Sequence, residues 1–164
     1  MPDFYWDPEV ARFRDETGRF VANDVVQGYV EDSLFATANA IDPLLDITIE
    51  GTLTPGQLEA RLREDLKREY LRQYYLGVGG RPQMTQADYG SIGGMLGFQY
   101  RKLSGFIEEI EAGDLSEAQI RARMRMYINS ARQAFEKAKA KAKVSAGYIY
   151  VRWVLNVAEH CDDC

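Results

Sequence analysis

The sequence predicts a mainly α-helical protein: a bundle of about four helices with an extended N-terminal arm and a C-terminal β-strand leading to a cysteine pair. Apolar residues recur at spacings of three and four between residues 24 and 146, which favours helices. One alternating run near the end indicates the strand. With 46% hydrophobic and 27% charged residues, the composition excludes a wholly disordered chain, a collagen and a disulfide-dense toxin.

Residues 1–23 predict an extended arm, because Pro2, Pro8 and Gly18 interrupt the segment and its aromatic residues follow no clear period. These aromatic residues are too numerous for a free linker. We therefore expect the arm to lie along another surface, either of this chain or of a neighbouring molecule. The side chains expected to dock on a partner are Phe4, Tyr5, Trp6 and Phe20.

The first helix is expected to begin near Asn23 or Asp24, because either side chain can cap the free N–H groups of a first turn. A stripe of apolar residues at helical spacing follows. Pro43 is expected to limit this helix, because its ring disfavours helical geometry at the preceding residue. Residues 44–52 then fit either a short second helix or an extended connection.

The next helix has a well-marked start. Thr54 is a favourable N-cap, Pro55 suits the first helical position, and Gln57 completes a capping-box pattern with Thr54. Leucine and tyrosine residues then recur every four positions, which predicts one buried stripe. The glycine-rich stretch 77–82 is expected to end the helix.

A third helix is predicted from about Thr85 to Ala112, and Asp88 follows Thr85 at capping-box spacing. Four glycines in its first half each cost about 1 kcal/mol relative to alanine. We expect them to allow a close helix–helix contact or to mark a break near Gly93. A phosphate-binding loop is rejected, because neither of the two common glycine motifs for phosphate is present. These glycines are Gly90, Gly93, Gly94 and Gly97.

A fourth helix is predicted to begin at the cap Ser116, with Gln119 three residues later, and to continue through a lysine-rich end. Alanine and lysine favour helix, and lysines suit the negative end of the helix dipole. The lysines fit either a solvated helix end or a basic surface for an acidic partner or DNA phosphates, without base specificity. They are Lys137, Lys139, Lys141 and Lys143.

Charge is distributed unevenly along the chain. Residues 1–53 contain 11 acidic and 3 basic residues, whereas residues 116–152 contain 9 basic and 2 acidic residues. The basic segment is therefore expected to contact an acidic partner, nucleic acid, or the acidic first third of this same chain. No apolar run approaches the about 20 residues that span a bilayer, so no membrane association is expected. The first residues do not resemble a secretory signal.

The alternating residues 148–157 are typical of a β-strand, with Ile149, Val151, Trp153, Leu155 and Val157 on one face. A single strand cannot satisfy its own backbone hydrogen-bonding groups. Three partners remain open from the sequence: the N-terminal arm, another subunit, or residues that this sequence does not contain.

The sequence ends with His160, Cys161 and Cys164, which place two thiols and an imidazole within five residues. A Cys-x-x-Cys pair can bind one tetrahedral metal, usually zinc, but a closed site needs about four ligands. Three interpretations stay open: half of a zinc or cysteine knuckle completed elsewhere, inert thiols, or a redox pair. Acidic neighbours disfavour the thiolate form and hence the redox pair.

Three features together resemble the phage minor head protein family, the Mu F-like head-morphogenesis proteins: the long helical N-terminal region, the strand-like stretch after it, and the cysteine element that follows. The stretch from Arg12 to Val21 is similar to a "D-x-x-T-G-R-F-V" stretch in phage structural proteins. The strand-like stretch Tyr150–Leu155 and the following His160–Cys164 are similar to the "W…HC-x-x-C" element of many members. In that family the cysteine element belongs to a small α/β domain that continues beyond it, whereas this sequence stops at Cys164.

The resemblance implies a structural virion component, made in the host cytoplasm and carried inside the head. Its implied partners are the portal protein, the major capsid protein or both, with packaged DNA and further copies of the chain as additional candidates. The alternative is a zinc-knuckle DNA-binding module that uses the basic end of the fourth helix. No catalytic arrangement of residues is recognisable, so we do not expect an enzyme.

This interpretation divides the chain into three parts. Residues 1–23 are expected to form the aromatic arm and residues 24–146 the helical domain. Residues 147–164 are expected to start an α/β domain that is truncated or completed by another molecule.

Overall fold

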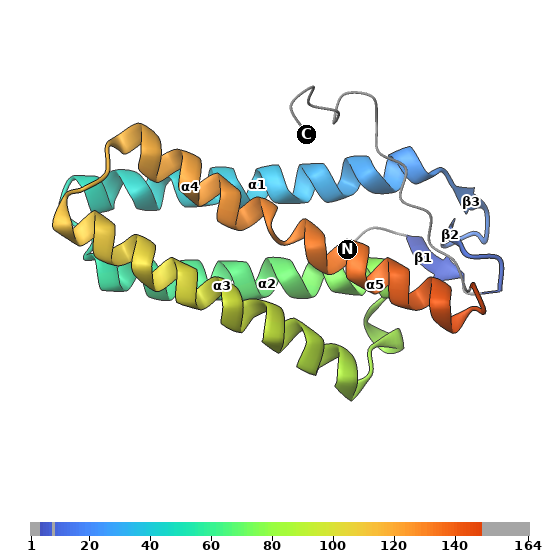
Figure 1. Ribbon diagram of the computed structural model, residues 1–164. Helices are drawn as coiled ribbons and strands as arrows, with labels where there is room; N and C mark the ends of the chain where they lie inside the picture. Colours follow the sequence, from blue (N-terminus) through green and yellow to red (C-terminus); the bar gives the residue numbers. More distant parts are fainter. Residues whose placement is uncertain (1–3, 8, 149–164) are drawn as a thin grey trace, which may run out of the picture.

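The computed structural model describes residues 4–7 and 9–148, which form an elongated helical bundle with a small β-sheet at one end (Figure 1). The predicted mainly helical fold is confirmed. The predicted strand at 148–157 and the cysteine pair lie outside the described residues, apart from Tyr148. Among the helices of the described part, none is long and apolar enough to cross a membrane.

The N-terminal segment, which the sequence predicted as an extended arm lying along this chain or a neighbour, forms an antiparallel sheet packed on this chain. Its strands β1 (Phe4–Asp7), β2 (Arg12–Asp15) and β3 (Phe20–Val21) are neighbours in chain order. The turn between β2 and β3 is stabilised by Asp15. Its carboxylate accepts hydrogen bonds from the backbone N–H groups of Thr17 and Arg19. With two to four residues each, the strands are too short to show their alternation in the sequence.

The sheet packs on the helices of its own chain. Trp6 and Phe13 lie opposite each other on β1 and β2, and their exposed fractions are 5% and 3%. The Phe13 ring stacks on Phe135 with the ring centroids 6.5 Å apart. Trp6 and Phe13 therefore belong to the same hydrophobic core as the helices.

Helix α1 (Asn23–Ile49) begins where predicted but continues through Pro43, so the prediction that Pro43 ends it is wrong. A proline inside a helix costs about 3 kcal/mol, because it removes one backbone hydrogen bond and its ring crowds the preceding turn. Ile41 and Leu45 are fully buried on either side of it. Their burial offsets that cost and keeps residues 44–49 helical.

Helix α2 (Pro55–Val78) confirms the predicted start and end. The Thr54 hydroxyl accepts a hydrogen bond from the Gln57 N–H, and the Gln57 side chain accepts one from the Thr54 N–H. The helix ends at Gly79, whose positive φ of 92° is the left-handed geometry that glycine adopts without strain. A 3₁₀ turn, η1 (Arg81–Gln83), leads into the next helix.

Helix α3 (Gln86–Ala112) confirms the third predicted helix and its Thr85–Asp88 capping box. Both explanations expected for its glycines are wrong within the described residues. The helix is continuous through Gly93 and Gly94. A Cβ atom added at Gly90, Gly93 or Gly94 would meet no described atom within 4 Å. This side of α3 faces open space.

The predicted fourth helix is two helices, α4 (Glu117–Asn129) and α5 (Arg132–Ser145), which differs from the single helix expected. Ser130 lies at the bend, where its hydroxyl donates to the Tyr127 carbonyl and pairs with the Tyr70 hydroxyl. Serine hydroxyls that bond to the preceding turn bend helices. In Figure 1, α4 and α5 lie between α1 and α3.

The bend lets α5 pack closely on α2. A Cβ atom at Gly77 of α2 would lie 2.5 Å from the Ala138 Cβ and 2.6 Å from the Phe135 carbonyl oxygen. Only a glycine fits at this contact. Ala131, Ala134, Phe135 and Ala138 are fully buried there, so small side chains on α5 continue the close approach.

Candidate interaction surfaces

Three basic residues of α4 and α5 contact the acidic α1 of the same chain. This outcome is one of the three that the charge distribution predicts. Arg121 also bonds to Glu117 of its own helix. Its bonds with Asp46 and Glu117 hold the pKa of the Arg121 guanidinium above its ordinary value. The pairs between the helices are Arg121 with Asp42 and Asp46, Arg125 with Asp42, and Arg132 with Glu31.

One of the predicted partner-binding lysines, Lys141, is held by a buried carboxylate. Its Nζ lies 2.6 Å from Oδ1 of Asp88, whose side chain is 1% exposed. Asp88 also accepts hydrogen bonds from the Tyr74 hydroxyl at 2.7 Å and from the Thr85 hydroxyl at 2.6 Å. Asp88 therefore joins the end of α2, the start of α3 and the end of α5.

Burial alone would raise the pKa of Asp88, but the hydrogen bonds from Lys141, Thr85 and Tyr74 hold that pKa well below its ordinary value. Burial, together with the bond to Asp88, raises the pKa of Tyr74 to about 12. Asp88 is therefore a buried, charged residue that connects three helices, rather than an acid that faces solvent.

The other predicted lysines lie in different environments. Lys139 Nζ is 3.5 Å from the Glu136 carboxylate and 5.0 Å from the centre of the Phe135 ring. Lys137 and Lys143 form no ion pair with any residue in 4–7 or 9–148. The four lysines therefore do not form one uniform basic surface.

A second buried carboxylate, Glu69 of α2, is absent from the sequence predictions. Its side chain is 1% exposed and accepts hydrogen bonds from Ser33, Thr37 and Gln73 at 2.7 to 2.8 Å. Arg72 adds an ion pair at 3.1 Å. The sequence contains one signal for the burial of Glu69. It follows the buried Leu66 by three residues and so lies on the same face of the helix.

The predicted docking residues of the N-terminal segment separate into buried and exposed side chains. Trp6 is buried in the core, so its assignment as a docking residue is corrected. Phe4 is half-buried against Phe13 and Tyr29. Tyr5 and Phe20 are 43% and 52% exposed and stay available for a partner.

A group of exposed apolar side chains on three helices also escapes the sequence analysis. Phe35 of α1, Met126 of α4 and Phe98 of α3 are 68%, 70% and 49% exposed. We call the surface defined by these three residues the α1–α4–α3 face. Apolar side chains of this size usually gain stability by burial, so their joint exposure makes this face a candidate contact surface.

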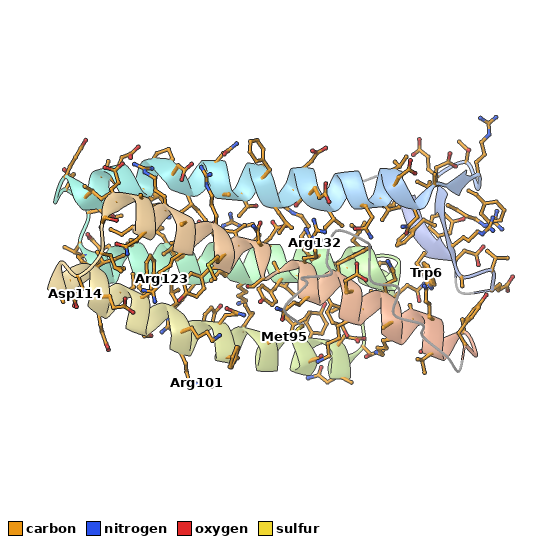
Figure 2. All side chains as sticks on the ribbon, turned by 45° about the horizontal axis from the view of Figure 1, so that its top comes forward. Trp6, Met95, Arg101, Asp114, Arg123 and Arg132 are labelled. Carbon is orange, nitrogen blue, oxygen red and sulfur yellow. The ribbon has the colours of Figure 1, made fainter. Side chains whose placement is uncertain are left out.

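Two grooves run along the α1–α4–α3 face on either side of α4. The groove between α1 and α4 encloses about 290 Å³ and includes Phe35. The groove between α3 and α4 encloses about 720 Å³ and includes Phe98 and Met126. Asn129 lines both grooves, so they are neighbours on one surface. Arg132 lines the first groove and Arg123 the second; both side chains are labelled in Figure 2.

The predicted metal ligands His160, Cys161 and Cys164 lie outside the described residues. Within the described part, no group of three or more His, Cys, Asp or Glu side chains has a metal-binding arrangement. Zinc binding therefore stays a prediction from the sequence.

No protein-family model, curated protein or solved structure matches this chain. The resemblance to phage minor head proteins consequently stays an expectation from the sequence. What the structure adds is a surface: three exposed apolar side chains beside two grooves on a helical bundle.

Proposed function

We propose that this chain is a structural protein of a phage head and that it associates with the portal or capsid through the α1–α4–α3 face. The single observation that supports docking most strongly is the joint exposure of Phe35, Phe98 and Met126 across three adjacent helices. The phage assignment comes from the sequence resemblance. The protein acts in the virion, inside the head, after its synthesis in the host cytoplasm.

The energetics of the face are consistent with a docking role. Burying one large apolar side chain contributes about 1.5–3 kcal/mol, so three such side chains supply a substantial part of the affinity of a specific complex. Interfaces concentrate their energy in a few large side chains that are surrounded by polar contacts. Arg101, Lys102 and Arg123 provide that surrounding in the groove between α3 and α4.

The charge of the same groove favours an acidic partner surface. Arg123 is paired with Glu109. Arg101 and Lys102 form no ion pair with a carboxylate in the described part of the chain, and both lie near the Phe98 ring. A partner that places carboxylates beside an apolar side chain would satisfy both cations and cover Phe98.

Co-sedimentation from phage-producing cells tests this proposal. We expect the chain to sediment with portal rings or head shells, identified by electron microscopy and mass spectrometry. Replacing Phe98 and Met126 together by Asp should abolish co-sedimentation, because charges would then occupy the apolar contact. Val144→Asp is the matched control, because Val144 is 62% exposed on α5 and lines neither groove.

Two results would contradict the proposal. One is a chain that remains a lone monomer in cells filled with portals and heads. The other is a Phe98/Met126 variant that still sediments as the Val144 variant does.

Metal analysis separates this proposal from the zinc-knuckle DNA-binding module. That alternative requires about one zinc per chain, lost when Cys161 and Cys164 are replaced by Ser. It also requires DNA binding that weakens steeply with salt. The lysines of α5 give this DNA-binding alternative little support, because Lys139 and Lys141 already contact carboxylates of this chain.

A further inference from the structure

A groove separates the N-terminal sheet from α5, at the opposite end of the bundle from the α3–α4 turn. It encloses about 580 Å³. Phe13, Phe20 and Val21 give it an apolar lining from the sheet, and Lys139 and Lys143 line it from α5. Arg12 adds a third cation, and the residues that line the groove include no carboxylate. The groove is therefore suited to an apolar chain with acidic residues near it.

Two polar features of the groove lack partners among residues 4–7 and 9–148. The indole Nε1 of Trp6, which lines the groove, is buried without a hydrogen-bond acceptor. A buried donor without a partner is costly and normally marks a missing contact. The second feature is β3, which is at the edge of the sheet and pairs on one side with β2. An extended segment beside it would find backbone partners.

Helix α5 ends beside this groove. Gly147 has a φ of 87°, and its N–H donates to the Val144 carbonyl. The Tyr148 N–H donates to the Lys143 carbonyl at 3.1 Å. These two bonds form a Schellman motif, which ends a helix and reverses the chain beside its last turn. Lys143 itself lines the groove, so the chain leaves α5 at the wall of the groove.

We propose that this groove binds residues 149–157 of the same chain. Their alternation places Ile149, Val151 and Trp153 on one face, which matches the apolar lining. A segment attached to the groove wall competes favourably with any separate molecule, because its effective concentration there is high.

This proposal does not depend on the role of the α1–α4–α3 face. A negative result for the groove would therefore not count against docking through that face.

Tryptophan fluorescence provides the test, because the chain has two tryptophans, Trp6 and Trp153. In a Trp6→Phe chain, all tryptophan emission comes from Trp153. We expect this emission to be blue-shifted and several-fold less quenched by acrylamide than that of free N-acetyltryptophanamide. The protection should be independent of protein concentration, because the contact lies within one chain.

A matched pair of variants locates the contact. Phe20→Glu places a charge in the groove, whereas Phe35→Glu makes the same change on α1, away from it; both phenylalanines are more than half exposed. We expect Phe20→Glu to restore quenching of Trp153 and Phe35→Glu to leave it protected. Hydrogen exchange of residues 149–157 in the Trp6-containing chain provides the same comparison without the tryptophan substitution.

Three results would overturn the inference. The first is a Trp153 that is quenched as readily as the free indole, with fast exchange of residues 149–157. The second is protection that survives Phe20→Glu. The third is protection that disappears on dilution, which would assign the groove to a second copy of the chain.

Discussion

Asp88 and Glu69 show how single buried carboxylates hold separate helices together. Asp88 receives bonds from α2, α5 and the residue before α3, and Glu69 receives bonds from α1 and from its own helix. A buried carboxylate is tolerated only when several donors replace its water shell. Each of these residues therefore fixes the relative position of the elements that donate to it.

Replacing Asp88 by Asn should lower the free energy of unfolding by about 1–3 kcal/mol, because the change removes charged hydrogen bonds and leaves Lys141 beside a neutral group. Urea denaturation followed by circular dichroism measures this difference. Glu136→Gln is the control: Glu136 is half-exposed and its pair with Lys139 is longer, so the change should cost less than about 0.5 kcal/mol. Equal losses in the two variants would contradict the role of Asp88.

The low pKa of Asp88 also predicts an acid-dependent loss of stability. In the unfolded chain this carboxyl binds a proton near its ordinary pKa of about 3.9, whereas in the folded chain it stays charged to lower pH. Its contribution is thus fully present above about pH 5 and is lost as the pH falls toward the folded pKa. Between pH 5 and pH 3, the Asp88→Asn variant should lose less stability than the parent chain. Parallel pH curves for the two would contradict this.

Local patterns identify Asp88 as part of a cap but do not reveal its second role. The Thr85–Asp88 spacing is sufficient to predict the capping box, because both residues lie in one turn. The bond from Lys141 joins residues 53 positions apart. Nothing in the short-range sequence distinguishes Lys141 from Lys137, so this pairing could not be predicted.

At the scale of elements, caps were predictable and bends were not. The starts of α2, α3 and α4 follow from capping boxes, and the ends of α2 and α3 follow from glycines. The passage of α1 through Pro43 depends on burial of both neighbouring turns, which involves other helices. The bend at Ser130 likewise depends on Tyr70, a residue of α2.

Two glycines predict opposite outcomes for the same substitution. Gly77→Ala should destabilise the chain, because its Cβ would lie 2.5 Å from the Ala138 Cβ and 2.6 Å from a backbone oxygen of α5. Gly94→Ala should raise the free energy of unfolding by about 0.5–1 kcal/mol, because its Cβ meets open space and alanine is the better helix former.

Thermal unfolding of both variants measures this difference in sign. Stabilisation by Gly77→Ala would show that α2 and α5 are not in close contact. Destabilisation by Gly94→Ala would show that a neighbour covers this side of α3 in solution.

At the scale of the whole molecule, the uneven charge of the sequence is in part satisfied within the molecule. Arg121, Arg125 and Arg132 contact acidic residues of α1, so the basic and acidic segments of the chain attract each other within one bundle. The sequence predicts this outcome as one of three, and only the arrangement of the helices selects it. The charge difference alone is thus weak support for nucleic-acid binding.

The candidate surface was less predictable than the fold. Helical periodicity identifies the residues that face the core, whereas the exposure of Phe35, Phe98 and Met126 comes from the structure. That their helix faces adjoin depends on α4 lying between α1 and α3. The number of N-terminal aromatic residues, in contrast, suggested docking on a partner, although Trp6 is part of the hydrophobic core.

The central claim, docking through the α1–α4–α3 face, is tested most directly by oxidative footprinting of Met126 in purified phage heads. Met126 is 70% exposed in the free chain, so its thioether should oxidise readily there. In heads, the account predicts that Met126 oxidises several-fold more slowly, while free chain in the same oxidant shows the uninhibited rate. Equal oxidation of Met126 in heads and in the free chain, or heads that contain none of this chain, would contradict the account.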